Sequence, residues 1–396
     1  MPSRIRAQDE ADFWRELRRE FTIPRHEAFF NTGTLGASPK VVQQAVIEHL
    51  RHVDRDLAHW DYQPDHEQFF TGYFPELRVR EKVGAVINAA GRDVALTQNA
   101  TFGMNFVAQG LDLAPGDEVV VTDQAHPGGR KGYDLRAKRH GIVLREIVVP
   151  DPPESPEQLV RLFLDATTER TRVWAIPHIS SARAIRYPVG TLCRLARERG
   201  IWSVVDGAQS AGHLRVDVRA MGCDAFFGSP HKWLLAPKGT GFLYIRPERQ
   251  REVWATLASG EWDNQDDPMF RLMQYGTGNL SLLRGLEKAL EFHLEIGSDR
   301  IERRIMGLAD RLRTGLAAIP RARIVSPTHP ELTCATTVYR IDGIPAGRVQ
   351  DWLWERGRVR VRSVGDTVGV RHGCHIYNSE AEVDRALELL AELART

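Results

Sequence analysis

The sequence predicts an α/β protein in which a mostly parallel sheet is sandwiched by helices, with a smaller α+β domain at the C-terminus. Short apolar and β-branched runs alternate with longer helical patterns through the middle of the chain, which is the order of βαβ units. Around residues 280–318 the pattern becomes long and helical, and a few strand patterns and a closing amphipathic helix follow it. The length of 396 residues exceeds one ordinary core of about 100–150 residues, which favours more than one domain.

Short apolar runs mark the strands of the sheet, which are expected in order at residues 93–97, 118–122, 142–149, 172–177 and 201–206. Helical patterns lie between them, at residues 101–111, 130–141, 157–166 and 191–200. Parallel sheets covered on both faces bind ligands at the carboxyl ends of their strands. We therefore expect one site where four strand-end loops converge, those after Thr97, Thr122, Pro177 and Val205.

The chain is expected to have three regions. Residues 1–30 form a helical segment that packs with the small domain, residues 31–290 form the large domain with the ligand site, and residues 291–396 form the small α+β domain. In the small domain, TTVYRI and RVRVRSV have strand patterns and SEAEVDRALELLAELART has the pattern of a closing helix. The sequence has no internal repeat, low-complexity tract or flexible linker, so the domains should pack closely.

Composition and charge exclude several classes of protein. With 42% hydrophobic and 27% charged residues, the chain is close to the globular average and is not a disordered, collagen-like or coiled-coil chain. Its 53 basic and 52 acidic residues leave a formal net charge of +1, which argues against nucleic acid as the main partner. No run approaches the ~18–20 apolar residues that span a bilayer, and the charged N-terminus lacks the apolar core of a signal peptide.

The spacing of the cysteines excludes two further classes of protein. The 4 cysteines are widely spaced, which fits neither a disulfide framework nor a zinc ribbon. We expect a cytoplasmic protein that binds no metal and has no nucleic-acid or membrane partner.

The most informative segment is residues 204–245. Asp206 ends an apolar strand pattern, and Lys232 follows in the loop Ser229-Pro230-His231-Lys232-Trp233, with a Gly-Thr-Gly element after it. Pyridoxal phosphate (PLP) chemistry needs such a pair: the lysine amine forms a Schiff base with the cofactor aldehyde, and the aspartate keeps the ring nitrogen protonated. Taken alone, each residue is more often a surface lysine or a satisfied carboxylate. Together, in this order and between these strands, they favour the catalytic interpretation.

This segment resembles the class V aminotransferase group of PLP enzymes of fold type I, and within it the isopenicillin N epimerase-like branch, with the cysteine desulfurases as cousins. The resemblance covers Asn31 to the C-terminus. The family's Asp-x-Ala-Gln appears as Asp206-Gly207-Ala208-Gln209, which implies that Asp206 pairs with the pyridine nitrogen and Gln209 hydrogen-bonds the phenolic oxygen. The family's Ser-x-His-Lys appears as Ser229-Pro230-His231-Lys232. It implies that Lys232 is the aldimine lysine and that Ser229 and His231 help to hold the phosphate.

The same resemblance assigns three further strand-end groups. Ala100 and Thr101 lie at a helix N-terminus, whose free N–H groups and dipole attract an anion. The family places the cofactor phosphate there, and Thr101 could at the same time cap the helix. His126 precedes a proline after the next strand, and in the family this histidine stacks on the pyridine ring. Ser181 stands where relatives often carry asparagine near the phenolic oxygen, and its hydroxyl can still donate one hydrogen bond.

Gly276-Thr277-Gly278-Asn279 resembles a Gly-Thr element that, in the family, reaches the phosphate of the neighbouring subunit. Thr277 therefore implies a homodimer with a shared active site. The alternative for these residues is an ordinary loop before a helix.

The amino-acid substrate is implied to bind through arginine. Arg371, in Val370-Arg371-His372-Gly373, resembles the family's arginine that binds the substrate α-carboxylate, a role that suits the planar guanidinium. Arg360 and Arg362 compete for this role, because RVRVRSV is a strand pattern with its arginines on one face. Asn31 belongs to an opening segment that crosses the substrate pocket in the family. Trp60 and Tyr62 could line that pocket or fill hydrophobic space.

Departures from the family pattern narrow the reaction. A cysteine desulfurase needs a nucleophilic cysteine on a loop before the substrate arginine. Here the matching region is the turn at residues 364–367, which has no cysteine, and Cys374 stands where relatives carry an apolar residue. The expected reaction is Cα deprotonation of an amino acid or derivative in an external aldimine, isopenicillin N epimerase-like, with Lys232 as the base on one face. Carbon–sulfur β-elimination and transamination are the alternatives, and a desulfurase is disfavoured.

Two other classes fit the sequence less well. A non-catalytic binding protein on the same fold would not need the intact set of Asp206, Gln209, His231 and Lys232. A Rossmann dehydrogenase needs GxGxxG in its first βα turn, whereas this chain has Gln98-Asn99-Ala100-Thr101.

Overall fold

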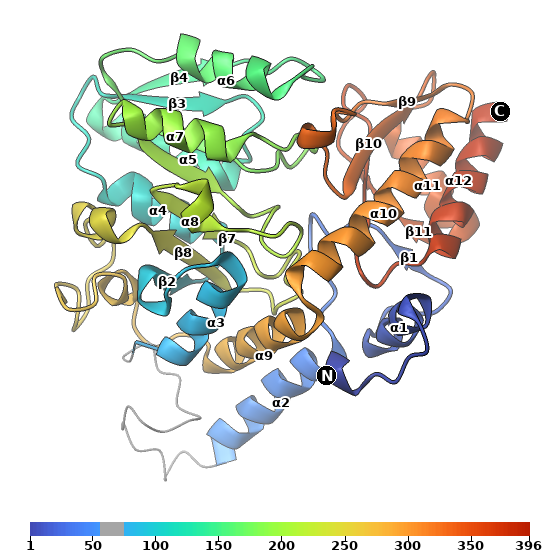
Figure 1. Cartoon of the computed structure of the whole chain (residues 1–396), viewed down its shortest axis with the longest axis horizontal. Helices are drawn as coiled ribbons and strands as arrows, with labels where there is room; N and C mark the ends of the chain where they lie inside the picture. The colour runs from blue at the N-terminus through green and yellow to red at the C-terminus, as the bar shows by residue number, and fades with distance from the viewer. Residues whose placement is uncertain (56–74) are drawn as a thin grey trace.

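The computed structural model describes residues 1–55 and 75–396 (Figure 1). Trp60 and Tyr62 lie outside the described residues. Within those two ranges, no helix has the length and apolar character to cross a membrane. The same ranges contain no group of His, Cys, Asp and Glu side chains that could hold a metal ion.

The large domain is built on a sheet of seven strands in the order β2-β8-β7-β6-β5-β3-β4. β8 is antiparallel to both of its neighbours and the other adjacent pairs are parallel, which confirms the predicted mostly parallel sheet. The strands are β2 Val94–Thr97, β3 Glu118–Thr122, β4 Val143–Ile147, β5 Thr171–Pro177, β6 Trp202–Asp206, β7 Ala225–Gly228 and β8 Gly241–Ile245. Every residue of β7 and β8 is buried, because helices cover both faces of the sheet.

The helices lie on both sides of this sheet (Figure 1). They are α3 Leu77–Ile87, α4 Ala100–Gly110, α5 Pro127–His140, α6 Pro156–Asp165, α7 Val189–Glu198, α8 Val218–Met221 and α9 Leu280–Ile296. Several of these helices are capped at their N-terminus by a short polar side chain. That side chain accepts a hydrogen bond from a backbone N–H group that the first helical turn leaves unpaired. Ser155 does so for α6 and Asp217 for α8. Short 3-10 helices occur at Pro2–Arg4, Arg18–Glu20, Gly91–Asp93, Pro247–Glu252, Phe270–Met273 and Pro330–Leu332.

The C-terminal part is an α+β unit whose antiparallel sheet has the order β12-β13-β10-β9. Its elements are α10 Ser298–Ala317, β9 Ala322–Ile324, β10 Thr336–Ile341, α11 Ala346–Gly357, β12 Arg362–Ser363, β13 Val370–Gly373 and α12 Glu380–Arg395. The predicted long helical region is two helices, because Gly297 ends α9 with φ of 90°, a backbone conformation that favours glycine. Ser379 and Glu382 form a capping box at the start of α12.

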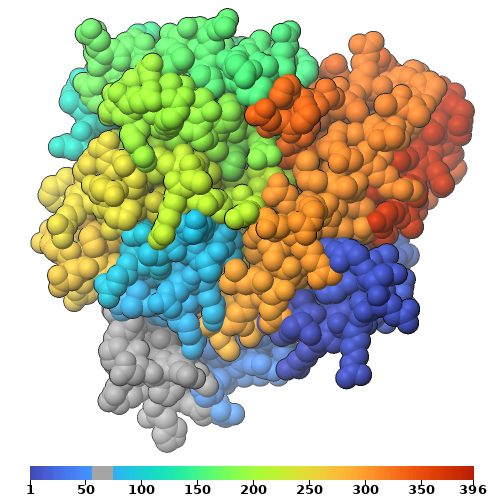
Figure 2. All heavy atoms as spheres, in the orientation of Figure 1, coloured from blue at the N-terminus to red at the C-terminus, as the bar shows by residue number. Residues whose placement is uncertain are grey.

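The N-terminal segment packs against this unit, and Figure 2 shows it in dark blue beside orange residues of the C-terminal half. It contains α1 Glu10–Leu17 and the short strand β1 Ala28–Phe29, which pairs in parallel with β11 Val359–Arg360. Trp14 and Leu17 are buried in the same apolar cluster as residues of α10 and α12. α2, Lys40–Arg55, leads from this segment along α9.

The buried apolar side chains form two large clusters that meet on α9. The first cluster surrounds the seven-stranded sheet and includes Leu290 of α9. The second cluster includes Phe292 of α9 together with residues of α1, α10 and α12. Trp233 and Leu235 come from the loop between β7 and β8, yet they belong to the second cluster. We therefore propose a domain division near residue 290, with this loop at the junction.

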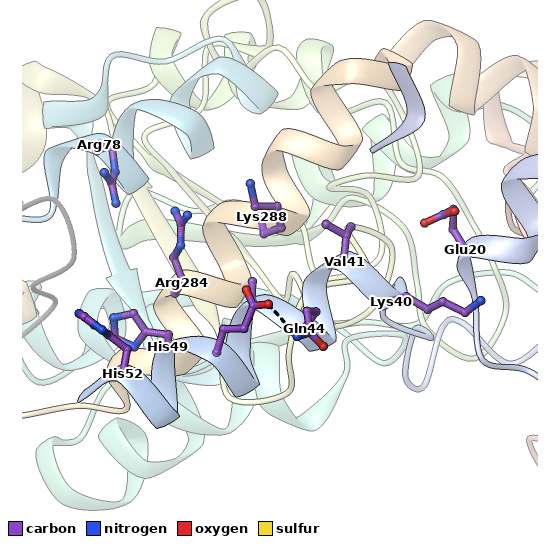
Figure 3. A pocket seen from close by; sticks show the side chains of 11 residues that line it. Glu20, Lys40, Val41, Gln44, His49, His52, Arg78, Arg284 and Lys288 are labelled. Atoms are coloured by element: carbon purple, nitrogen blue, oxygen red, sulfur yellow. Dashed lines mark hydrogen bonds between the residues drawn. The ribbon is translucent and has the colours of Figure 1, made fainter. Parts of the chain in front are cut away.

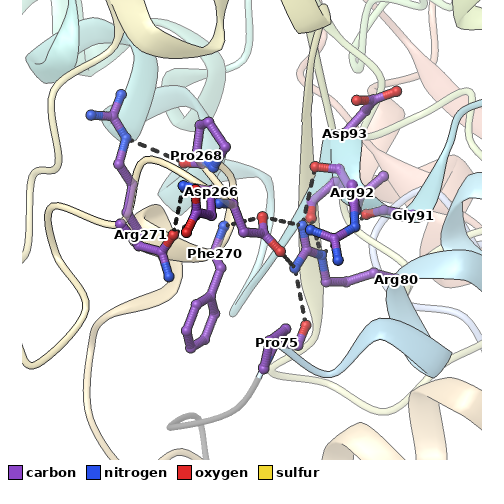
Figure 4. Close-up of polar contacts among 12 residues, drawn as sticks. Pro75, Arg80, Gly91, Arg92, Asp93, Asp266, Pro268, Phe270 and Arg271 are labelled. Atoms are coloured by element: carbon purple, nitrogen blue, oxygen red, sulfur yellow. Dashed lines mark hydrogen bonds and ion pairs between the residues drawn. The ribbon is translucent and has the colours of Figure 1, made fainter.

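A buried ion pair anchors the edge of the sheet beside β2 (Figure 4). Arg80 of α3 is fully buried, and its guanidinium binds both carboxylate oxygens of Asp267 at 2.7 and 2.8 Å. The same guanidinium donates to four backbone carbonyls, those of Pro75, Gly91, Arg92 and Val94. All of its donors are used, so the charge is compensated only while Asp267 is present.

Replacing Asp267 with alanine should lower the free energy of unfolding by about 3–5 kcal/mol, because it leaves a buried arginine without its counter-charge. Urea unfolding followed by tryptophan fluorescence measures this loss. The matched control is Asp266→Ala, which removes an exposed carboxylate one residue away and should change stability by at most about 0.5 kcal/mol. Equal losses in the two variants would contradict a special role for the buried pair.

Candidate active site

The loops after β2, β3, β5 and β6 converge on one cavity of about 490 Å³, as predicted from the order of the strands. The loop between β7 and β8 of the same domain also lines it, and the strands β12 and β13 close it from the small domain. The predicted site residues that line it are Ala100, Thr101, His126, Ser181, Asp206, Ser229, His231, Lys232 and Arg371. Asn31 and Gln209 are not in the lining, but they are hydrogen-bonded to the lining residues Arg371 and Ser181. Thr277 is exposed and lies outside the lining.

Lys232 is held in place by the N-terminal segment. The backbone N–H of Gly36 donates to the carbonyl of His231 at 2.8 Å, and Nζ of Lys238 donates to the carbonyl of Gly36 at 2.9 Å. A β-carbon on Gly36 would lie 2.0 Å from the carbonyl oxygen of Lys232, so only glycine allows this approach. The segment that follows β1 therefore fixes the backbone of the lysine loop.

Trp233 anchors the same loop on its other side. Its ring is buried between His213 and His375, with ring centroids 3.8 and 5.5 Å away. Its indole N–H donates to Oε1 of Gln209 at 2.8 Å. With the tryptophan directed into the interior, the neighbouring Lys232 side chain lines the cavity.

Burial lowers the pKa of Lys232 to about 8, with the positive charge of Arg371 acting in the same direction and the carboxylate of Asp206 opposing it. About a tenth of this amine is therefore neutral at pH 7, whereas an ordinary lysine is almost wholly protonated. Between pH 8 and the ordinary value near 10.5, the unfolded chain binds more protons than the folded one. The contribution of Lys232 to stability therefore rises with pH through that window.

The acetylation rate of Lys232 in the cofactor-free protein should rise about tenfold per pH unit up to about pH 8 and then level off. Peptide mass spectrometry after brief treatment with acetic anhydride measures it. In Asp206→Asn the inflection should move to lower pH, because the carboxylate that raises the pKa is gone. An inflection near the ordinary lysine value in the unmodified protein would contradict the burial argument.

Asp206 is the last residue of β6, and its side chain lines the cavity. Its Oδ1 accepts the backbone N–H of Ala208 at 2.9 Å. Burial raises the pKa of this carboxyl, while that hydrogen bond and the charge of Lys232 lower it. A β-carbon on Gly129 would lie 2.2 Å from Oδ2 of Asp206. Glycine in the first turn of α5 is therefore what gives the carboxylate its room.

The N-terminus of α4 lines the cavity through Asn99, Ala100 and Thr101. The backbone N–H of Ala100 donates to Oγ of Ser229 at 3.1 Å, and the free N–H groups of the helix end favour a negative charge. Asn99, not Thr101, caps the helix: its side chain accepts from the N–H of Phe102. An asparagine one residue before the helix has the extended backbone that a cap needs, and Thr101 is already inside the first turn.

His231 completes this end. Its Nδ1 is buried without a hydrogen-bond partner among the described residues. Burial, and then the charge of Lys232, lowers the pKa of this ring to about 4. A hydroxyl, a helix N-terminus and an unpaired imidazole nitrogen beside a partly neutral lysine fit the phosphate and aldehyde of PLP.

His126 also lines the cavity and is the N-cap of α5, where its Nδ1 accepts the N–H of Gly128 at 3.0 Å. Burial and the charge of Lys232 lower the pKa of this ring, which favours a neutral aromatic face toward the cavity.

Arg371 lies in β13 and is buried, and both terminal nitrogens of its guanidinium donate hydrogen bonds to neutral groups. One terminal nitrogen donates to the carbonyl and hydroxyl oxygens of Ser181 at 2.7 and 3.1 Å. The other donates to Oδ1 of Asn31 at 3.2 Å and to Oγ1 of Thr34 at 2.7 Å. Gln209 donates to the carbonyl of Gly33 at 2.8 Å and to Oγ of Ser181 at 3.5 Å. These contacts orient the guanidinium, which still lines the cavity.

The arginines of RVRVRSV do not share one face, contrary to the strand pattern. The segment breaks at Val361 into β11, which pairs with β1, and β12, which pairs with β13. Arg360 lies over the ring of Trp354, 4.0 Å from its centroid, outside the cavity lining. Arg362 lines the cavity beside Arg371. The prediction of one continuous strand was wrong, because the two halves of the segment pair with different strands, β11 with β1 and β12 with β13.

A second cavity of about 780 Å³ lies between α2, α3 and α9 (Figure 3). Several of its basic side chains are already paired with carboxylates of α9: Arg78 and Arg284 with Glu287, and Lys288 with Glu291. It has none of the strand-end groups, so we place the chemistry in the smaller cavity.

Sequence reasoning missed several residues that shape the site. Gly129, Thr34 and Trp233 have structural reasons for their identity, but the sequence patterns assigned them no role. The pair Gly128-Gly129 in a first helical turn was a usable signal, because glycine is unfavourable inside a helix unless something approaches closely. Nothing in the local sequence marks Thr34, whose partner Arg371 is far along the chain.

A lysine on a loop at the domain junction, a carboxylate at a neighbouring strand end and an anion site at a helix N-terminus define, on this fold, the fold type I PLP enzymes. The chain belongs to the class V aminotransferase family, whose model matches residues 30–386. It is therefore a PLP-dependent enzyme, as the sequence resemblance implied.

Relatives and solved structures agree with this family. The chain is 30% identical to isopenicillin N epimerase of Amycolatopsis lactamdurans over 97% of this chain and 100% of that protein. It is 26% identical to a probable cysteine desulfurase of Methanothermobacter thermautotrophicus, over 96% of this chain and 98% of that protein. Among solved structures, the apo cysteine desulfurase of Thermococcus onnurineus NA1 has a TM-score of 0.84 at 24% identity, covering 98% of this chain and 100% of that chain. The cystine C–S lyase C-DES, solved with glycine covalently linked to PLP, has a TM-score of 0.83 at 23% identity and covers 95% and 99%.

Proposed function

We propose that this enzyme removes the α-proton of an amino acid or amino-acid derivative and that a proton is then delivered to the opposite face of Cα, which gives the epimer. The observation that carries the proposal is a largely buried lysine with a pKa of about 8 in the same cavity as a largely buried carboxylate and an oriented arginine. A base poised near the working pH is suited to proton transfer. Isopenicillin N epimerases as relatives over nearly the whole chain support this outcome.

Bound PLP supplies an electron sink that stabilises negative charge at the substrate Cα. Asp206 is placed to hold a proton on the ring nitrogen, because its carboxylate is buried and anchored by the Ala208 N–H. Ala100, Thr101, Ser229 and His231 hold the phosphate. His126 covers one ring face, and Gln209 and Ser181 serve the phenolic oxygen.

Arg371 binds the substrate α-carboxylate. Its guanidinium touches only neutral partners, Asn31, Thr34 and Ser181, so its charge is available to an anion. With the carboxylate held there, Lys232 takes the α-proton as a neutral amine.

A desulfurase role is not supported by the cysteines. All 4 are buried, and burial raises the pKa of Cys374 to about 12, so it stays a thiol. None of them lines the cavity within the described residues.

We also propose that the enzyme is a homodimer in which Thr277 of each subunit serves its neighbour's phosphate site. The exposed position of Thr277, away from its own cavity, supports this. Sedimentation equilibrium should then give twice the chain mass of 44.7 kDa, and a monomer would contradict it.

The test of the reaction is proton NMR in heavy water with the holoenzyme and L-amino acids, including cysteine conjugates. We expect loss of the α-proton signal together with the D-isomer. Pyruvate with a released thiol would instead establish a carbon–sulfur lyase. A keto acid that forms only with an amino acceptor would establish an aminotransferase. Absence of exchange with every substrate would overturn Cα deprotonation.

A further inference from the structure

Two arginines face the cavity from neighbouring strands. Arg362 of β12 and Arg371 of β13 are direct partners in the antiparallel register. Residues directly opposite one another in such a pair project their side chains from the same face of the sheet. Both side chains line the same cavity, so the cavity wall formed by the small domain carries two adjacent positive charges.

Nothing in the described chain neutralises this pair. Arg371 donates to neutral oxygens. The guanidinium of Arg362 has no hydrogen bond or ion pair with another residue in the ranges 1–55 and 75–396. The nearby carboxylate of Asp366 is used by the backbone N–H of Ala346 at 2.8 Å. Like charges directly opposite one another in a sheet repel each other. An anion bound between the two arginines would relieve this repulsion, so the pair is suited to anion binding.

The proposed reaction has an anionic partner for only one of the two arginines. The cofactor phosphate has its own site at the N-terminus of α4, with Ser229 and His231. The α-carboxylate of an amino acid occupies Arg371. Among the described residues, Asp206 is the only carboxylate in the cavity lining, and it faces Lys232. One cation, Arg362, is left without an anionic partner in this part of the chain.

We propose that Arg362 binds a second anionic group on the substrate side chain, so that the preferred substrates are amino acids or derivatives with a distal carboxylate. This inference rests on the proposed function, because it assigns Arg371 to the α-carboxylate. The pairing is charge-assisted and can be bidentate. It also gives the cavity specificity, since a neutral isostere leaves Arg362 unpaired.

The holoenzyme should be tested with matched L-amino acid pairs of equal shape: aspartate and asparagine, glutamate and glutamine, and 2-aminoadipate and its side-chain amide. α-Proton exchange in heavy water gives kcat/KM for each. At least one acid should exceed its amide by roughly 10- to 100-fold, the range of a charge-assisted hydrogen bond. Arg362→Gln should bring that ratio close to one.

The matched control is Arg360→Gln, which removes one positive charge two residues earlier but acts on a side chain that lies over Trp354. It should preserve the acid-to-amide ratio of the unmodified enzyme. A binding readout without turnover is calorimetric titration with glutarate and its half-amide. Glutarate should bind more tightly, and the difference should disappear in Arg362→Gln alone.

The outcomes separate this inference from the proposed function. Exchange with amides as fast as with acids would overturn the role of Arg362 and leave Cα deprotonation intact. That role would be overturned equally if Arg360→Gln abolished the preference as fully as Arg362→Gln. Absence of exchange with all substrates would overturn the proposed function, and equal glutarate and half-amide binding would then overturn the anion site independently.

Discussion

Replacing Lys232 with alanine is expected to lower kcat for α-proton exchange by at least about 10²–10⁴-fold, the contribution of a positioned general base. Burial lowers the pKa of this amine to about 8, and no other lysine lines the cavity within the described residues. The covalent bond to the cofactor should be lost as well, so the yellow colour of the purified protein should disappear after dialysis. Stopped-flow kinetics and absorption spectra measure the two effects.

Lys131→Ala is the matched control. This lysine lies on α5, which begins at the cavity, but its side chain is exposed and its Nζ pairs with Asp134 of the same helix. Its removal should leave colour and exchange rate within a few fold of the unmodified enzyme. A Lys232→Ala protein that remains coloured after dialysis and turns over at the unmodified rate would sink the assignment.

Replacing Asp206 with asparagine should lower kcat/KM by about 10²–10³-fold, the cost of removing one preorganised electrostatic group. Asparagine has the same shape and can keep the hydrogen bond to Ala208, but it has no charge with which to hold a proton on the ring nitrogen. Because Lys232 is still present, this variant should keep its colour. Loss of rate with retention of colour separates Asp206 from Lys232.

Asp123→Asn provides the control for this substitution. Asp123 follows strand β3 of the same sheet, and its Oδ1 accepts the N–H of Val149 outside the cavity. Its rate should stay within a few fold of the unmodified enzyme. Equal rate losses in the two variants would show that strand-end carboxylates matter for folding and not for the reaction.

Much of the large domain could be predicted from local patterns. The strand expected at residues 118–122 is β3 with the same bounds, and the runs ending at Thr97 and Asp206 are β2 and β6. These strands could be predicted because both faces of the sheet are covered, so that most of their residues are apolar. β7 and β8 were not predicted as strands, because both are short and lie within the motif-rich segment between Val204 and Ile245.

Sequence patterns failed where a choice between partners decides the structure. RVRVRSV has the alternation of a single strand, yet it divides because β1 and β13 each take half of it. Thr101 and Asn99 are both good caps, and the position where the chain enters the helix selects Asn99. Gly129 is explained only by Asp206, which comes from another strand.

The sequence by itself determined the fold class, the order of the strands along the chain, and the lysine and aspartate that identify a PLP enzyme, because each depends on residues that are close together in the chain. Only the tertiary structure decided that Arg371 is held by Asn31, Thr34 and Ser181, and that Arg362 stands beside it in the cavity. The contacts of Arg371 join residues some 190 to 340 positions apart. The order of residues along the chain carries no local signal for such contacts, since they arise only when two domains close on one another.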